Sequence, residues 1–129
     1  MASMFDFACV LLGGGLGAGC RHLVAGPIAE RIHVPSWVAI LVVNVLGCLF
    51  AGWLIGTLGE SALTRSPHTL AFALTGFAGG FTTFSTAMLD AWLLRKGGGS
   101  PCALVCLLAT PLLGVASMLF GLFVGGRLS

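Results

Sequence analysis

Residues 70–94 read LAFALTGFAGGFTTFSTAMLDAWLL, an apolar segment long enough to cross a bilayer but unusual at its centre. Gly79 and Gly80 precede a cluster of four hydroxyl side chains, Thr82, Thr83, Ser85 and Thr86. Glycine weakens a helix by about 1 kcal/mol relative to alanine, and serine and threonine offer the backbone competing hydrogen bonds. Irregular backbone at membrane depth is tolerated only where it is buried in protein or lines a wet cavity. We therefore expect a third helix that is broken for a functional reason.

The composition of the whole chain agrees with a membrane protein. Of its 129 residues, 57% are hydrophobic and only 8% are charged, and the mean hydropathy is +1.06. Soluble domains carry about 25% charged residues, so this chain has too little polar surface to cover itself in water. A spanning helix needs about 20 apolar residues. The sequence predicts an all-α protein with one membrane domain, residues 1–129, and four transmembrane helices.

The apolar runs place these helices at about 4–24, 37–58, 70–94 and 101–124. The first run is rich in glycine, which predicts close packing against another helix. Gly26, Pro27 and the polar residues 30–33 predict a connection or a short interfacial helix, and residues 59–68 predict a loop. The N-terminus lacks a basic region before its apolar run, so it is typical of a first span and not of a cleaved signal.

Charged side chains fall in or near the gaps between the runs. Four spans place both termini on one side of the membrane. The odd-numbered loops carry four basic side chains against two on the other side, so the positive-inside rule gives only a weak orientation. The four on one side are Arg21, Arg31, Arg95 and Lys96, and the two on the other side are Arg65 and Arg127. A chain with so little bias can insert in both orientations.

The sequence contains no arrangement of residues that is typical of an enzyme. The three histidines are scattered through connecting regions, no nucleophile has an adjacent base, and the five cysteines have no metal-site spacing. The net charge of +2 is too small for a nucleic-acid partner. Transport or ion conduction remains the usual task of a helical membrane protein of this size.

Asn44 is the central polar residue of the second span. One reading is a hydrogen bond between helices that contributes about 1 kcal/mol. The other is an amide N–H donor aimed at an anion in a pore. The residue by itself leaves both readings open.

The third segment resembles the signature of the Fluc (CrcB) family of fluoride channels, here Gly79, Gly80, Phe81, Thr82, Thr83, Phe84, Ser85 and Thr86. Two other stretches are similar to that family: Gly17, Ala18 and Arg21 in the first helix, and Val43, Asn44, Val45 and Gly47 in the second. The resemblance covers the four-helix layout. It implies a passive fluoride exporter of the cell membrane that lowers cytoplasmic fluoride toxicity, built as an antiparallel, dual-topology dimer with two pores.

The resemblance also implies site residues. A structural Na⁺ at the dimer centre would be held by the backbone carbonyls of Gly79 and Thr82. Carbonyls freed from helical bonding are suitable ligands for such a cation, and its charge would lower the cost of a nearby anion. Asn44 matches the pore asparagine and Phe84 the first of two pore phenylalanines, whose ring edge is electropositive. Ser85 and Thr86 are further hydroxyl donors, although such residues often bond their own helix.

Ala87 departs from the family pattern, which has its second phenylalanine at this position. Phe77 and Phe81 lie nearby in sequence but are not presumed to replace it. Two explanations stay open: the chain pairs with a different, paralogous subunit, or one ring per pore is enough. We expect reduced or altered conduction compared with a complete aromatic pair.

Two rival functions come from other classes. A small multidrug-type, proton-coupled transporter needs a carboxylate within the membrane, but Asp6 and Asp90 lie toward helix ends and Glu30 and Glu60 in loops. A non-conducting subunit of a heterodimeric channel would also explain the glycine-rich faces. Fluoride itself follows only from the family resemblance, since nothing in these residues distinguishes it from chloride by physical chemistry.

Overall fold

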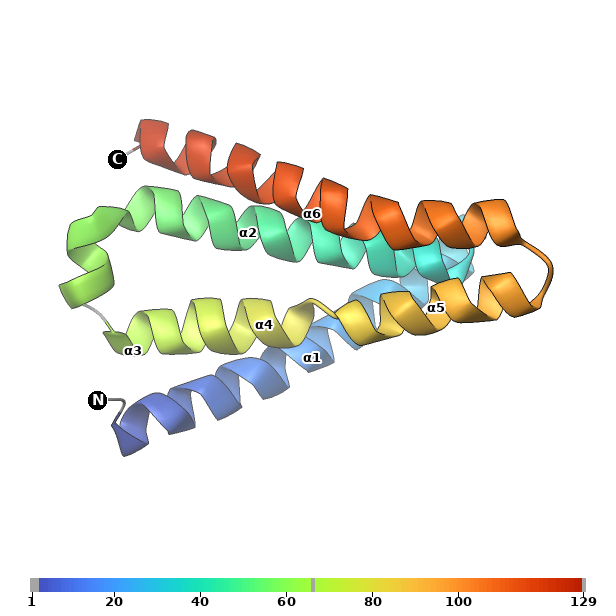
Figure 1. Ribbon diagram of the computed structural model, residues 1–129. Helices are drawn as coiled ribbons and strands as arrows, with labels where there is room; N and C mark the ends of the chain where they lie inside the picture. The colour runs from blue at the N-terminus through green and yellow to red at the C-terminus, as the bar shows by residue number, and fades with distance from the viewer. Residues whose placement is uncertain (1–2, 66, 129) are drawn as a thin grey trace.

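Two extended residues interrupt the third apolar segment in the computed structural model, which describes residues 3–65 and 67–128. Helix α3, Pro67–Leu70, continues as a π-helical stretch, η1, Ala71–Ala78, and as α4, Gly79–Phe81. The chain is extended at Thr82 (φ −80°, ψ 156°) and Thr83 (φ −152°, ψ 116°), and α5 follows at Phe84–Lys96. The expected broken helix is therefore confirmed (Figure 1).

The break lies after the glycine pair and not within it. Gly79 is helical, with φ −63° and ψ −39°. Gly80 packs so closely against α1 that an added Cβ would overlap the carbonyl oxygen of Gly14. The lack of a side chain at Gly80 therefore lets α4 pack closely against α1. The extended backbone begins only at the β-branched Thr82.

The other helices are longer than the apolar runs predicted. Helix α1 spans Met4–Ile32, α2 spans Ser36–Arg65, and α6 spans Ser100–Leu128. The connection or separate short helix expected around Pro27 is wrong, because α1 continues through this proline to Ile32, with His33 as its left-handed C-cap (φ 55°). Helix α2 is kinked at Gly59 (φ 63°, ψ 174°), where the expected loop begins, but residues 60–65 are again helical.

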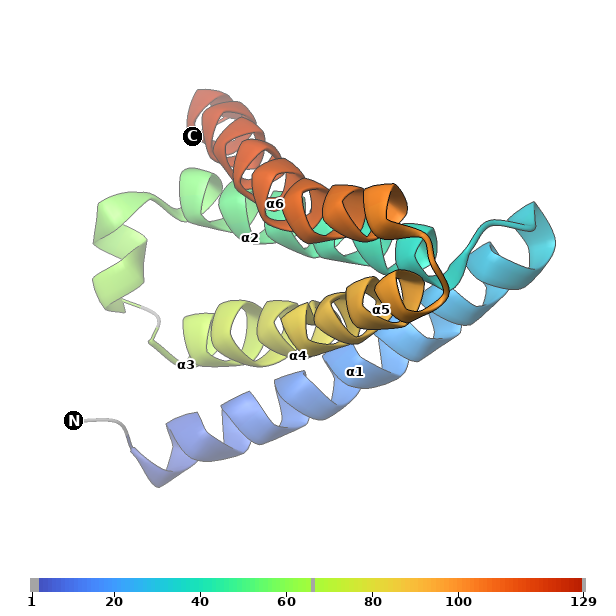
Figure 2. The ribbon, with the colours of Figure 1, turned by 45° about the vertical axis from the view of Figure 1, so that its right-hand side comes forward.

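Glycines set the distance between α2 and α6, which lie side by side in Figures 1 and 2. A Cβ at Gly52 would overlap the carbonyl oxygen of Met118, and one at Gly121 would overlap that of Leu49. Gly56 and Gly125 repeat the arrangement one turn further along. Such close backbone approach is the main source of helix association in lipid, where apolar burial contributes little.

Helix α1 packs against η1 and α4 in the same way. Side chains added at Gly13 or Gly17 would overlap backbone atoms of Phe72 and Phe77, so the tight packing expected of the first helix is confirmed. Between this pair and α2, the ring of Phe77 stacks on that of Phe81 at 6.0 Å and meets Phe50 edge-on at 5.8 Å.

Large apolar side chains cover the outside of the bundle. Leu11 on α1 and Leu112 on α6 are examples, each more than half exposed. Among the described residues, three helices are long and apolar enough to span a membrane: Met4–Ile32, Ser36–Gly59 and Ser100–Arg127. The divided third segment runs alongside them (Figure 2). The chain is a multi-pass, all-α membrane protein.

Candidate functional site at the helix break

The Asn44 side chain holds the broken backbone. Its Nδ2 donates to the carbonyl oxygen of Thr83 at 2.9 Å, and its Oδ1 accepts from the Thr83 N–H at 2.7 Å. Asn44 is only 5% exposed, so these bonds form where water does not compete. A buried backbone group without a partner is costly, and Asn44 supplies partners that an unbroken helix would have supplied. The hydrogen-bonding reading of Asn44 is thus confirmed in the single chain.

The Thr83 hydroxyl organises the start of α5. As the N-cap, its Oγ1 accepts from the Thr86 N–H at 3.3 Å. The same Oγ1 lies 3.2 Å from Ser85 Oγ and 3.0 Å from Thr86 Oγ1. Ser85 and Thr86, expected as hydroxyl donors, therefore belong to one cluster centred on Thr83.

The break releases carbonyls from helical bonding, and those of Gly79 and Thr82 are among them. Because the Thr83 N–H is bound to Asn44, it cannot serve Gly79 O four residues earlier. Because the Thr86 N–H is bound to Thr83 Oγ1, it does not serve Thr82 O. The family resemblance implies these two carbonyls as cation ligands, and that role stays a prediction.

Arg21 reaches the break from α1. Its Nη1 donates to the carbonyl oxygen of Thr82 at 3.1 Å. A carbonyl oxygen has two lone pairs, so Thr82 O can accept this bond and offer a second one. The contact joins residues far apart in sequence, and nothing in the local pattern around Arg21 indicated it.

A groove of about 280 Å³ opens beside the break, between α2 and α6. Phe84, 60% exposed, forms part of its wall. The lining residues are Asn44, Cys48, Thr82, Thr83, Phe84, Thr110, Pro111, Gly114 and Val115. The structure therefore brings four of the predicted site residues into the lining, and the other five lie outside it: Arg21, Gly79, Ser85, Thr86 and Ala87.

Helix α6 contributes the far side of this groove, where Thr110 was a possible hydroxyl donor by sequence but more typical of a helix-bonded threonine. The hydroxyl of Thr110 donates to the carbonyl of Cys106 at 3.0 Å, as expected of a threonine in a spanning helix. Pro111 follows within the helix. A proline removes one helical N–H bond. The Thr110-Pro111 pair in the middle of this span is therefore the sequence feature that could have indicated residues lining the groove.

Ala87 is enclosed by protein. It is 1% exposed, and the Cys106 Sγ lies 3.6 Å from its carbonyl oxygen. Phe77 and Phe81 pack between α2 and the first half of the broken segment, and neither lines the groove. In the single chain, the aromatic ring of the groove is that of Phe84.

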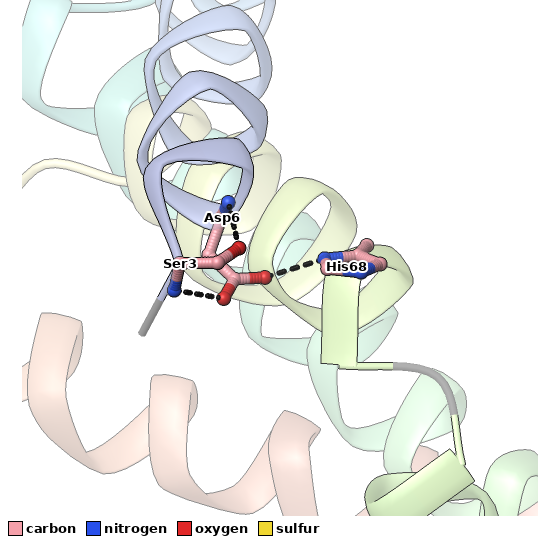
Figure 3. A network of polar contacts seen from close by, with 3 residues as sticks. All are labelled: Ser3, Asp6 and His68. Carbon is pink, nitrogen blue, oxygen red and sulfur yellow. Dashed lines mark hydrogen bonds and ion pairs between the residues drawn. The ribbon is translucent and has the colours of Figure 1, made fainter. Parts of the chain in front are cut away.

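The remaining polar contacts tie helix ends together. At the start of α1, Asp6 completes a capping box with Ser3 and binds His68 of α3, with 2.6 Å between Oδ1 and Nδ1 (Figure 3). At the opposite end, Ser36 Oγ lies 3.4 Å from Asp90 Oδ2. Within residues 3–65 and 67–128, no three His, Cys, Asp or Glu side chains gather as a metal site.

Comparisons with known proteins give a consistent answer. The family model described as CrcB-like protein, Camphor Resistance (CrcB), matches residues 8–122. Similar curated proteins are the "Fluoride-specific ion channel FluC" of Maridesulfovibrio salexigens, 36% identical over 95% of this chain and 96% of its own, and that of Sphingopyxis alaskensis, 42% identical over 78% and 76%. "Fluoride-specific ion channel FluC 2" of Cutibacterium acnes is 36% identical over 92% of this chain and 95% of its own.

These relatives are named as ion channels, which agrees with the expectation that the chain is not an enzyme. The match extends from α1 to α6 and includes the paired hydrogen bonds between Asn44 and Thr83 (the Asn44–Thr83 clamp), the break and the groove. The chain belongs to the CrcB-like family.

Proposed function

We propose that this protein is a fluoride-specific channel that lets fluoride leave the cell passively and so lowers its toxicity in the cytoplasm. The observation that carries the proposal is the Asn44–Thr83 clamp, which holds a helix break open beside a groove. Non-helical backbone at membrane depth is tolerated where it is buried in protein or lines a wet cavity, and this break is both held by buried Asn44 and open to the groove. The names of the relatives supply the ion.

The groove offers weak contacts that suit a small anion. The edge of the Phe84 ring carries the positive part of its quadrupole. The Asn44 Nδ2 has two hydrogens, and one is donated to Thr83. The other is the donor we assign to fluoride, and the hydroxyls of Ser85 and Thr86, which contact Thr83 Oγ1 beside the groove, are proposed as further donors. Weak and multiple sites let an ion enter and leave quickly.

We further propose that two copies form an antiparallel dimer of dual topology. Phe84 is 60% exposed although it belongs to the site, so a second chain would complete the walls of the groove. The weak charge bias of the loops supports insertion in both orientations.

A structural Na⁺ fits the chemistry of the break. The carbonyls of Gly79 and Thr82 lack their helical N–H partners because Asn44 and the Thr83 hydroxyl occupy those donors. Carbonyl oxygens are the ligands that hard cations prefer. When bound there, the cation would supply fixed positive charge near the anion path. The Arg21 guanidinium, which donates a hydrogen bond to Thr82 O, is a second positive charge near the proposed anion path.

A non-conducting subunit of a heterodimeric channel is the second candidate, because Ala87 stands where the family has a second phenylalanine. A paralogous partner would then bring the missing ring. The proton-coupled transporter is disfavoured, since Asp6 is bound to His68 at the start of α1 and Asp90 lies beside Ser36 at the start of α2.

Purified protein in liposomes tests the proposal. We expect fluoride efflux that requires only a potassium ionophore for charge balance and that exceeds chloride efflux. Replacing Asn44 and Phe84 should lower it. If the homodimer shows no fluoride efflux but efflux appears when a paralogous subunit is added, the second candidate is supported. If neither form shows fluoride efflux, both proposals are overturned.

A further inference from the structure

A second groove lies away from the helix break, where α5 and α6 run side by side toward the turn that joins them (Figure 1). Its volume is about 490 Å³, within the range of small-ligand sites. Its wall is mostly apolar, with Met88 and Ala91 on α5 and Ala103, Leu104 and Leu107 on α6.

Basic and aromatic side chains gather at one end of this groove. Trp92 and Arg95 line both the groove and an adjoining hollow that Lys96 completes. Lys96 Nζ lies 4.6 Å from the centre of the Trp92 ring. Tryptophan and basic residues at the end of a spanning helix mark the level of the lipid headgroups. The structure therefore has a charged mouth at headgroup depth and an apolar trough leading from it.

Within the part of the chain that the structure describes, no aspartate or glutamate lines either hollow. Asp90 belongs to a different groove, where it lies beside Ser36. The first turn of α6 also lacks an acidic residue. The partial positive charge of this helix start, at Ser100, adds to that of Arg95 and Lys96.

We infer that this groove binds one anionic glycerophospholipid, with its headgroup phosphate at Arg95 and Lys96 and one acyl chain along α5 and α6. Charge complementarity selects the anionic headgroup, since each basic side chain at the surface attracts anionic lipid. The apolar trough accepts the chain that is attached to that headgroup. The site is separate from the fluoride groove and does not depend on conduction.

Trp92 provides a local reporter for the test. In a Trp37→Phe, Trp53→Phe background, Trp92 is the sole tryptophan, and its fluorescence is quenched by lipids with brominated acyl chains. The full-length protein is placed in phosphatidylcholine vesicles that contain increasing amounts of brominated phosphatidylglycerol or brominated phosphatidylcholine. We expect half-maximal quenching at about a tenfold lower fraction of phosphatidylglycerol.

The Arg95→Gln, Lys96→Gln double variant should abolish this preference, while Arg127→Gln, which removes a cation at the far end of α6, should leave it intact. Both sites are exposed, so the variants should fold. Equal quenching by the two lipids would overturn the inference, as would a preference that survives in the double variant. Absence of quenching by either lipid would overturn it too, since a second protein copy would then cover the groove.

Discussion

Asn44 and the backbone of Thr83 form a reciprocal amide pair, with both hydrogen bonds between 2.7 and 2.9 Å. The pair has the pattern of two residues bonded across a β-ladder, although one partner is a side chain. It joins α2 to the break in the third segment and fixes the direction in which α5 departs. One residue thus supports the fold and stands in the wall of the proposed pore.

Replacement of Asn44 by alanine should destabilise the protein. The change leaves the buried N–H and C=O of Thr83 without partners, which costs about 1–3 kcal/mol for each unsatisfied group. Thermal unfolding in detergent, followed by the loss of the folded peak in size-exclusion chromatography, measures the effect. Asn44→Asp is the matched control, because it keeps an acceptor for the Thr83 N–H but not the donor. An unchanged melting temperature for Asn44→Ala would contradict the clamp.

The hydroxyl of Thr83 should matter separately from its backbone. Thr83→Val keeps the shape and the Asn44 bonds but removes the N-cap of α5, at a cost of about 1 kcal/mol. Thr83→Ser retains the hydroxyl and should unfold close to the original protein. The same melting assay compares the two variants, and equal losses in both would argue against the cap.

The break could be predicted from sequence because glycine and hydroxyl residues both disfavour helix. Its exact place could not, since Gly79 and Gly80 remain helical and packing against α1 explains the small residue at Gly80. Tertiary contact decided this point, and local propensity did not. The continuation of α1 through Pro27 was not predicted, because the single hydrogen bond that a proline removes does not always end a helix.

The site was predicted only in part. Asn44 was recognised as a central polar residue, but the choice between clamp and donor depends on what α5 brings near it. The bond from Arg21 to Thr82 O joins two segments through the fold alone, and sequence spacing carries no signal for such a contact. The role of Thr83 as an N-cap was visible in principle, since threonine favours that position.

Gly52 should be intolerant of substitution because it faces the backbone of α6. Gly52→Ala would force α2 and α6 apart, and we expect a loss of about 1–3 kcal/mol. Gly19 on α1 has no atom within 4 Å of an added Cβ, so Gly19→Ala is the control and should be neutral or slightly stabilising. Melting temperatures of both variants provide the comparison. A clear loss at Gly19 would instead indicate that a second copy packs there.

Phe84→Leu should reduce fluoride efflux without reducing stability. The ring is mostly exposed in the single chain, so little packing is lost, but the electropositive edge is removed from the groove. A contact of this kind contributes about 1 kcal/mol, which corresponds to roughly a five- to tenfold change in rate. Efflux from liposomes and thermal unfolding are measured on the same preparation. Normal efflux in a stable Phe84→Leu protein would remove Phe84 from the pore.

Ala87→Phe tests whether the missing ring limits conduction. Ala87 is buried against Cys106, so a benzyl group must displace its neighbours, and such overpacking costs about 1–3 kcal/mol. We therefore expect the single variant to be unstable, and Ala87→Phe combined with Cys106→Ala to recover part of that loss. If the ring then completes the aromatic pair, efflux by the double variant should exceed that of Cys106→Ala alone. Equal efflux in the two folded proteins would mean that one ring per pore is enough, because the added phenylalanine then contributes nothing to the passage of the ion.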